Sequence, residues 1–395
     1  MRRVLAIVIG SNDMTVATFD SHASSVEAID RTVVGADVHI GDDARLSSPG
    51  HRVGDPVPIF LPDGRSATGA RLVATSIAEL ASRAAHDVIV VVHPATWSRY
   101  AVATLDAELS KAGVRAILLD RPSVADMWLR SVGTASEEGQ AVVVEVGYDD
   151  TVVSCSRREA GRTGVVTEPG SDAFGAVLVD RALLGHVVAQ VQTTDTSFDP
   201  ADPSNWNDLH DVARRVSVAR RRLDSVPTVD LDVSLGGVRR TLRLVRSELE
   251  ELIVGDVVRM ASRVAGTVAQ FRTPVDAVVV HGAAASIPMV AEALSARTRT
   301  TVILADTPES VVVKGAVLWA VSLVGSVEPT VRIAVPIPAK RSSIWTRGRL
   351  WAASGVAALL LVGGFAATQT FDSTPASGPA PLPSAQMVGS IQPGR

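Results

Sequence analysis

Cysteine and lysine are both scarce in this chain of 395 residues. Cys155 is the only cysteine, which excludes an intramolecular disulfide and a thiolate metal cluster and suits a reducing cytosol. Its place in an alternating strand predicts a structural residue rather than a reactive thiol. The basic residues include only three lysines, and the first of them is Lys111. A catalytic lysine in the first hundred residues is therefore excluded.

The chain also lacks long blocks of one charge. Its net charge is -4, and basic residues cluster only in an arginine-rich segment at 207–224 and a short stretch at 340–349, which argues against nucleic-acid binding. We expect the arginine-rich segment to be a solvated helix face, with contact to a nucleotide or an acidic partner as the alternative. The eight histidines are scattered, without an HExxH pattern or a Cys/His cluster, so no metal site is predicted. Altered magnesium binding by Asp149 and Asp150 stays an alternative.

A single long apolar run without charge occupies residues 350–368. As a helix it would be roughly 28 Å long, close to the thickness of a bilayer core. Basic residues precede it and Trp345 and Trp351 flank its start, which predicts one transmembrane helix with the N-terminal domain in the cytoplasm. A buried core helix is the alternative. Residues 326–349 would then be a linker with a basic juxtamembrane segment, and 369–395 a disordered, proline-rich extracytoplasmic tail that is either passive or a short docking peptide.

Residues 1–325 alternate strands and helices, which is typical of an α/β fold. The apolar run at 4–9 is too short for a signal peptide and indicates a buried strand. It opens a strand, turn and strand at 4–20, and the same arrangement returns at 140–157. We therefore predict a duplicated, two-lobed α/β domain, with lobes at about 1–139 and 140–325 and a nucleotide-sized cleft between them.

The remaining pattern gives a coarse set of elements. Residues 32–67 are expected to be mostly loop, and Ser247-Glu248-Leu249-Glu250 has the spacing of a capping box that starts a helix. Helices are predicted at about 68–85, 97–111, 122–132, 173–191, 207–224, 247–271, 288–297 and 308–324, and strands at 88–92, 114–119, 228–234, 238–244, 277–280 and 301–304.

The order of these motifs resembles the nucleotide-binding domain of Hsp70, within the Hsp70, actin and sugar-kinase ATPase superfamily. The resemblance covers about residues 4–325 and rests on stretches such as IVIGSNDMTVATFD, LLDRPSVADMW, VVVEVGYDDTVVS, VARRVSVARRRLDS and HGAAASIPMVAEAL. It implies an actin-like fold with ATP or ADP and magnesium between the lobes. The residues that it implies for nucleotide binding, if a nucleotide binds, are Gly10, Ser11, Asn12, Gly147, Arg220, Arg221 and Gly282.

The sequence departs from the family pattern where catalysis would need it. Val8 stands where the family has an aspartate, and the family's lobe-one lysine has no counterpart. In the second loop, Tyr148 and Asp149 replace glycines, so a ring and a carboxylate are expected to disturb phosphate binding. Ser286 replaces an arginine that stacks on adenosine. Because phosphoryl transfer depends on positioned charge and metal-held water, we predict no catalytic residues and a pseudo-ATPase, with weak nucleotide binding as a related possibility.

An Hsp70-like domain followed by one membrane span and a short outer tail looks like the type VII (ESX) secretion-associated proteins of actinobacteria. This resemblance implies a plasma-membrane accessory or scaffold component of a type VII secretion system, with other membrane components as partners. One alternative is a divergent ATPase or chaperone-like enzyme that hydrolyses ATP slowly. Another is an actin-like scaffold in cell division or cell-wall assembly. The residues after 325 read as linker, span and tail, so clamping of unfolded clients is not expected.

Overall fold

The computed structural model describes residues 3–324, apart from gaps at 11–12, 21–24, 34–48, 62–63, 134–137, 160–161, 166–169, 194–197 and 272. The described residues belong to one compact unit, Met1–Val335. Within them, no helix is both long and apolar enough to cross a bilayer. The predicted linker, transmembrane helix and tail at 326–395 lie outside the described residues.

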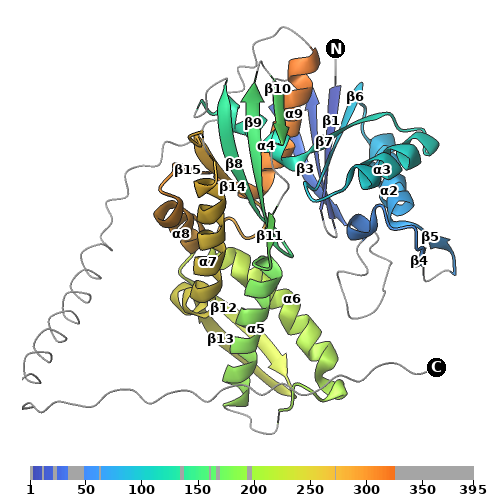
Figure 1. Ribbon diagram of the computed structural model, residues 1–395. Helices are drawn as coiled ribbons and strands as arrows, with labels where there is room; N and C mark the ends of the chain where they lie inside the picture. The colour runs from blue at the N-terminus through green and yellow to red at the C-terminus, as the bar shows by residue number, and fades with distance from the viewer. Residues whose placement is uncertain are drawn as a thin grey trace, which may run out of the picture. The chain divides into compact units, whose positions relative to one another are not determined.

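The first sheet is built around the predicted N-terminal hairpin (Figure 1). Its strand order is β3-β2-β1-β6-β7, and β1 runs antiparallel to β2 and parallel to β6. The edge strand β3 was not predicted, because its charged residues give it no clear apolar face, as is common at sheet edges. The strands are β1 (Arg3–Ile9), β2 (Asp13–Asp20), β3 (Ser25–Val33), β6 (Val88–His93) and β7 (Ala116–Asp120).

The second sheet repeats this plan. Its order is β10-β9-β8-β14-β15, with β11 paired to β9; β8 runs antiparallel to β9 and parallel to β14. A central strand thus has a hairpin partner on one side and two parallel strands on the other in both sheets, which confirms the predicted duplication. The strands are β8 (Gly139–Val146), β9 (Thr151–Glu159), β10 (Arg162–Val165), β11 (Gly170–Asp172), β14 (Ala277–His281) and β15 (Val302–Leu304).

The helices begin where the sequence offers caps. Thr68, Ser98 and Asp120 each accept a backbone N–H bond at a helix start, as capping residues do. The helices are α2 (Gly69–Arg83), α3 (Arg99–Lys111), α4 (Arg121–Ser131), α5 (Ala176–Gln192), α6 (Trp206–Leu223), α7 (Arg246–Ala269), α8 (Pro288–Thr298) and α9 (Val311–Val324), with short turns η1 (Pro49–Arg52), η2 (Pro203–Asn205) and η3 (Pro308–Ser310).

The predicted capping box at Ser247 is wrong. Helix α7 begins at Arg246 after Val245, which makes no side-chain capping bond. The helix continues directly from a hairpin, β12 (Thr228–Leu235) and β13 (Val238–Val245), and the Arg246 N–H donates to the carbonyl of Pro227. The hairpin therefore binds the first N–H group of the helix directly. A second small hairpin pairs β4 (Ile59–Phe60) with β5 (Ser66–Ala67).

Both central strands are buried on both faces. In β1, Leu5 and Ile7 pack in the core that includes α2 and α3, whereas the alternate residues Val4 and Ala6 pack with α9. In β8, Val142, Val144 and Val146 join the large core of the second lobe, whereas Ala141 and Val143 pack with α4. Covering both faces explains why these strands carry continuous apolar runs, residues 4–9 in β1 and 141–144 in β8.

The two inner helices are exchanged between the halves of the chain. Helix α4 comes from the first half but packs on the second sheet through Ala125, Trp128 and Leu129, whereas α9 comes from the second half and packs on the first sheet. The helices cross between the sheets (Figure 1). The expected boundary near residue 139 therefore divides the sheets but not the helices that cover them.

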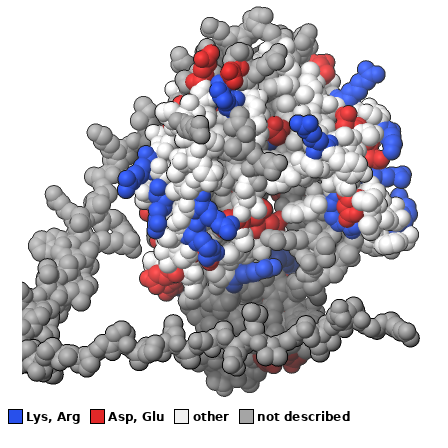
Figure 2. Space-filling model, viewed as in Figure 1, with Lys and Arg blue, Asp and Glu red and all other residues white. Residues whose placement is uncertain are grey.

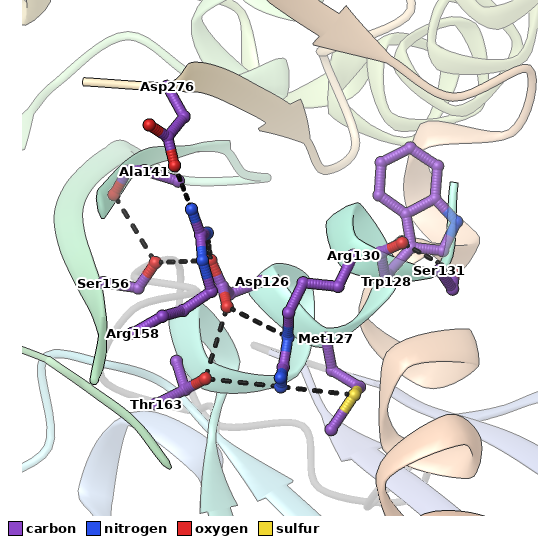
Figure 3. A network of polar contacts seen from close by, with 10 residues as sticks. All are labelled: Asp126, Met127, Trp128, Arg130, Ser131, Ala141, Ser156, Arg158, Thr163 and Asp276. Carbon is purple, nitrogen blue, oxygen red and sulfur yellow. Dashed lines mark hydrogen bonds and ion pairs between the residues drawn. The ribbon is translucent and has the colours of Figure 1, made fainter. Parts of the chain in front are cut away.

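A buried ionic network fastens α4 to the second sheet (Figure 3). Arg158 on β9 and Asp126 on α4 are almost fully buried and lie 2.5 Å apart, Nη1 to Oδ1. Arg158 also contacts the carboxylate of Asp276 just before β14, and Ser156 donates to Asp126 at 3.0 Å. Because removal of one partner would leave a buried charge uncompensated, these contacts favour a single position of α4 on the sheet.

The crossing of α4 and α9 depends on Gly315. A Cβ atom there would meet the backbone carbonyl of Val124. Glycine to alanine within a helix ordinarily stabilises a protein by about 0.5–1 kcal/mol, but Gly315→Ala is expected to destabilise the chain by about 1–3 kcal/mol through overpacking. The free energy of unfolding in urea measures this. Gly266→Ala in α7 is the control, because no described atom outside its own helix backbone lies within 4 Å of the added Cβ, and it should increase the free energy of unfolding. A change of this free energy in the same direction for both variants would contradict the tight crossing.

Candidate functional site

A cavity of about 310 Å³ lies where the parallel strands of both sheets end. In α/β proteins this is the end at which ligands bind. Arg121 follows β7, Glu145 lies near the end of β8, and His281 ends β14. Of the residues predicted for a nucleotide site, the cavity brings together Gly10, Gly147, Arg220, Arg221 and Gly282, whereas Ser11 and Asn12 lie outside the described residues.

Two matched glycine turns contribute to the cavity wall. The Gly10 N–H donates to the carbonyl of Asp13 at 2.8 Å, and the Gly147 N–H donates to that of Asp150 at 2.8 Å. A Cβ at Gly10 would lie 2.8 Å from the Asp13 carbonyl oxygen, and one at Gly147 would lie 2.9 Å from that of Asp150. Both positions therefore require glycine for the turn itself, before any ligand is considered.

The third glycine is packed onto the second turn. Gly282 has a φ of 110°, a value that favours glycine, and a Cβ there would meet the carbonyl of Val146. The N–H of Ala284 donates to that same carbonyl at 3.0 Å. The loop after β14 and the turn after β8 thus form one rigid part of the cavity.

The two predicted cations differ in what they offer. Arg220 is 2% exposed and donates to Asp180 at 2.8 Å and to the carbonyl of Ala283 at 3.4 Å. It therefore joins α5, α6 and the loop after β14. Arg221 is exposed and also lines the cavity, so it is the better placed of the two to meet a ligand. Ser286 donates to Asp224 at 2.6 Å, and burial raises the pKa of that carboxyl group.

Arg121 is one of several cavity residues that the sequence analysis missed, together with Glu145 and His281. Its guanidinium contacts the Glu145 carboxylate from the second lobe and the carbonyl of Ile9 from the first. Burial lowers the pKa of Arg121 to about 10, an effect that Asp150 and Asp13 oppose, so the side chain stays charged at neutral pH. The sequence did offer a signal for this site, because Arg121 is a charged residue that stands between a predicted strand and Pro122 at the start of a helix.

A second contact joins the lobes beside the cavity. Nε2 of His51, in η1, lies 3.1 Å from Oδ2 of Asp149. Asp149 therefore turns toward His51 and is not among the cavity-lining residues, contrary to the expectation that it would face a phosphate. Tyr148 does line the cavity and is 42% exposed. Burial, with Asp180 and Asp149, raises the pKa of Tyr148.

Two buried nitrogen atoms of the cavity residues have no hydrogen-bond partner. They are Nε of Arg121 and Nε2 of His281. His281 is 3% exposed, and burial, with the nearby charge of Arg121, lowers its pKa to about 3. The imidazole is therefore neutral at physiological pH. Four other buried side-chain atoms of the described residues also have no hydrogen-bond partner. Arg121 and His281 differ from these in that both line the cavity, where a polar ligand group would supply the missing partner.

His281 should make stability depend on pH. Its folded pKa of about 3 lies below the usual 6.5, so the unfolded chain takes up the proton first as the pH falls. The contribution of the neutral His281 side chain to the free energy of unfolding is complete above pH 6.5. It is lost as the pH falls toward 3, and the free energy of unfolding then drops by at most about 1.4 kcal/mol per pH unit. The free energy of unfolding in urea, measured at several pH values, should fall less steeply with decreasing pH for His281→Gln than for the unsubstituted chain. The exposed control His210→Gln should keep the original slope, and equal slopes for all three proteins would contradict the buried neutral imidazole.

Comparison with known proteins identifies relatives of this architecture. Residues 131–335 match the Hsp70 protein family. The chain is similar to two proteins described as "Chaperone protein HscA homolog", at 28% identity over 194 residues in Burkholderia ambifaria and 27% over 193 residues in Burkholderia lata. Each alignment covers 48% of this chain but only 30% of the relative. Because the family match covers more than half of its residues, the chain belongs to the Hsp70 protein family.

Proposed function

We propose that this Hsp70-like domain binds ADP or ATP in the cleft and uses it as a regulatory ligand with little or no hydrolysis. The observation that carries the proposal is the cavity between the two glycine turns, where Arg121 and His281 each leave a buried nitrogen without a partner. Turns hold phosphate groups through successive backbone N–H groups. Because the N–H groups of Gly10 and Gly147 close the turns themselves, the phosphate contact would come from other N–H groups of the two turns. Membership of the Hsp70 protein family supports nucleotide as the ligand class.

The same residues do not favour turnover. Phosphoryl transfer needs a metal-bound phosphate and an oriented water, but the cavity has the apolar Val8 where the family pattern has an aspartate, and Glu145 contacts Arg121. Of the described residues that line the cavity, none is a lysine. Magnesium therefore fits the residues poorly, whereas a nucleotide phosphate fits them better. A slowly hydrolysing, chaperone-like ATPase is the competing function.

Nucleotide titration and phosphate release separate these functions. ADP and ATP are expected to bind the purified full chain in mild detergent with micromolar Kd, and Gly147→Ala should weaken both by about tenfold by displacing the Asp150 carbonyl. Gly164→Ala in β10, where nothing lies within 4 Å, is the control. Phosphate release from ATP should be the same for all three proteins. Phosphate release by the unsubstituted chain that is absent in Gly147→Ala would favour the ATPase. Filaments of the purified chain would favour an actin-like scaffold.

We also propose that residues 350–368 anchor the domain in the plasma membrane, with the domain in the cytoplasm, as an accessory component of a type VII secretion system. The support is the uncharged apolar run with basic residues before it and a proline-rich tail after it. Both signs of charge are interspersed over the described residues of the face in Figure 2, which supports a protein partner over nucleic acid.

Membrane fractionation tests the anchor. In cells, the full chain is expected to stay with the membrane pellet after alkaline carbonate washing, and deletion of 350–368 should release it. External protease should remove an epitope placed after residue 395 but leave the N-terminal domain intact. A full chain that is released by carbonate would contradict the anchor, and crosslinking that yields no type VII component would contradict the secretion role.

A further inference from the structure

We propose that the cleft holds the phosphate groups of its nucleotide without a divalent metal, and that the Arg121 guanidinium is the cation that replaces the metal. The inference rests on the nucleotide binding proposed above. It concerns a residue that the chain places between the two glycine turns, at the first position of α4. Guanidinium groups bind phosphate through several directed hydrogen bonds.

The position of Arg121 is fixed before any ligand arrives. Asp120 caps α4 by accepting from Ser123 N–H at 2.8 Å, and Pro122 occupies the first turn. One end of the guanidinium contacts the Ile9 carbonyl, which leads into the Gly10 turn, and the other contacts Glu145, two residues before the Gly147 turn. The cation is thus preorganised at the point where the two turns face the same cavity.

The surrounding residues disfavour a divalent cation at this point. Magnesium is held through oxygen ligands, usually with one or two carboxylates. Three carboxylates of the described residues line the cavity, those of Asp13, Glu145 and Glu309. Glu145 already forms an ion pair with Arg121, and Asp13 and Glu309 each already have a polar or electrostatic partner. Val8 offers no oxygen from its side chain. In the described ranges, no group of three or more His, Cys, Asp and Glu residues could hold a metal ion. A dication would also be repelled by the partly buried guanidinium of Arg121.

The unpartnered atoms suit a phosphate oxygen instead. Nε of Arg121 is a donor, and Nε2 of His281 is a donor in one of its neutral tautomers. An anionic oxygen accepting from both would satisfy two buried polar groups at once. Because His281 stays uncharged beside Arg121, it can approach the guanidinium without repulsion. The exposed Arg221, at the same cavity, supplies a second positive charge for a diphosphate.

Calorimetric titration of ADP into the purified full chain, in mild detergent, tests the inference. The Kd measured with excess EDTA is expected to lie within about threefold of that measured with excess magnesium. Adenosine should bind at least about tenfold more weakly than ADP, because it lacks the phosphates that Arg121 would hold. Arg121→Gln should weaken ADP binding by about tenfold or more and leave adenosine binding unchanged.

Arg83→Gln is the matched control, because Arg83 is exposed on α2 and pairs only locally with Glu79; ADP binding should not change. Binding that EDTA abolishes and magnesium restores would overturn the metal-free site and leave the proposed nucleotide binding intact. No binding in either buffer would overturn both. Equal affinities for adenosine and ADP would also overturn the inference. If Arg121→Gln does not fold, the EDTA comparison and the adenosine ratio on the unsubstituted chain still decide the outcome.

Discussion

The close crossing of α4 and α9 is the contact on which the two lobes depend. Each helix covers the inner face of the sheet that belongs to the other half of the chain, and Gly315 lets them approach to the backbone of Val124. A larger residue would separate the helices and expose apolar strands on both sides. The ionic network around Arg158 and Asp126 then holds α4 in one position on the second sheet.

The same crossing sets the chemistry of the cleft. Because α4 begins at the end of β7, its first residue, Arg121, lies at the cavity, and its last turns lie against the second sheet. The ion pair with Glu145 and the contact between His51 and Asp149 join the lobes across the cleft. The fold of this protein therefore places a positive charge in the cleft and makes two contacts between the lobes. Neither the charge nor the contacts require a bound ligand.

Local patterns predicted most of the fold and part of the site. The two hairpins and the apolar strands were predictable because their periodicity and tight glycine turns are local signals. The edge strand β3 was missed for want of an apolar face, and the start of α7 depends on Pro227, a contact made across a hairpin. Arg220 was predicted at the cavity, but its burial against Asp180 and Ala283 involves residues distant in sequence. Such long-range pairing leaves no trace in spacing alone.

The exchange of inner helices has a consequence during synthesis on the ribosome. When β7 and α4 have emerged, the inner face of the first sheet has only Val124 of α4 against it among the described core residues, since α9 begins only at Val311. Ribosomes add about 5–20 residues per second, so the stretch of about 180 residues between α4 and α9 takes roughly 9–36 s to make. During that time Val4, Ala6 and Val90 lack the cover that α9 gives them. The nascent N-terminal half therefore keeps apolar strand residues exposed until nearly all the residues of the domain have been translated.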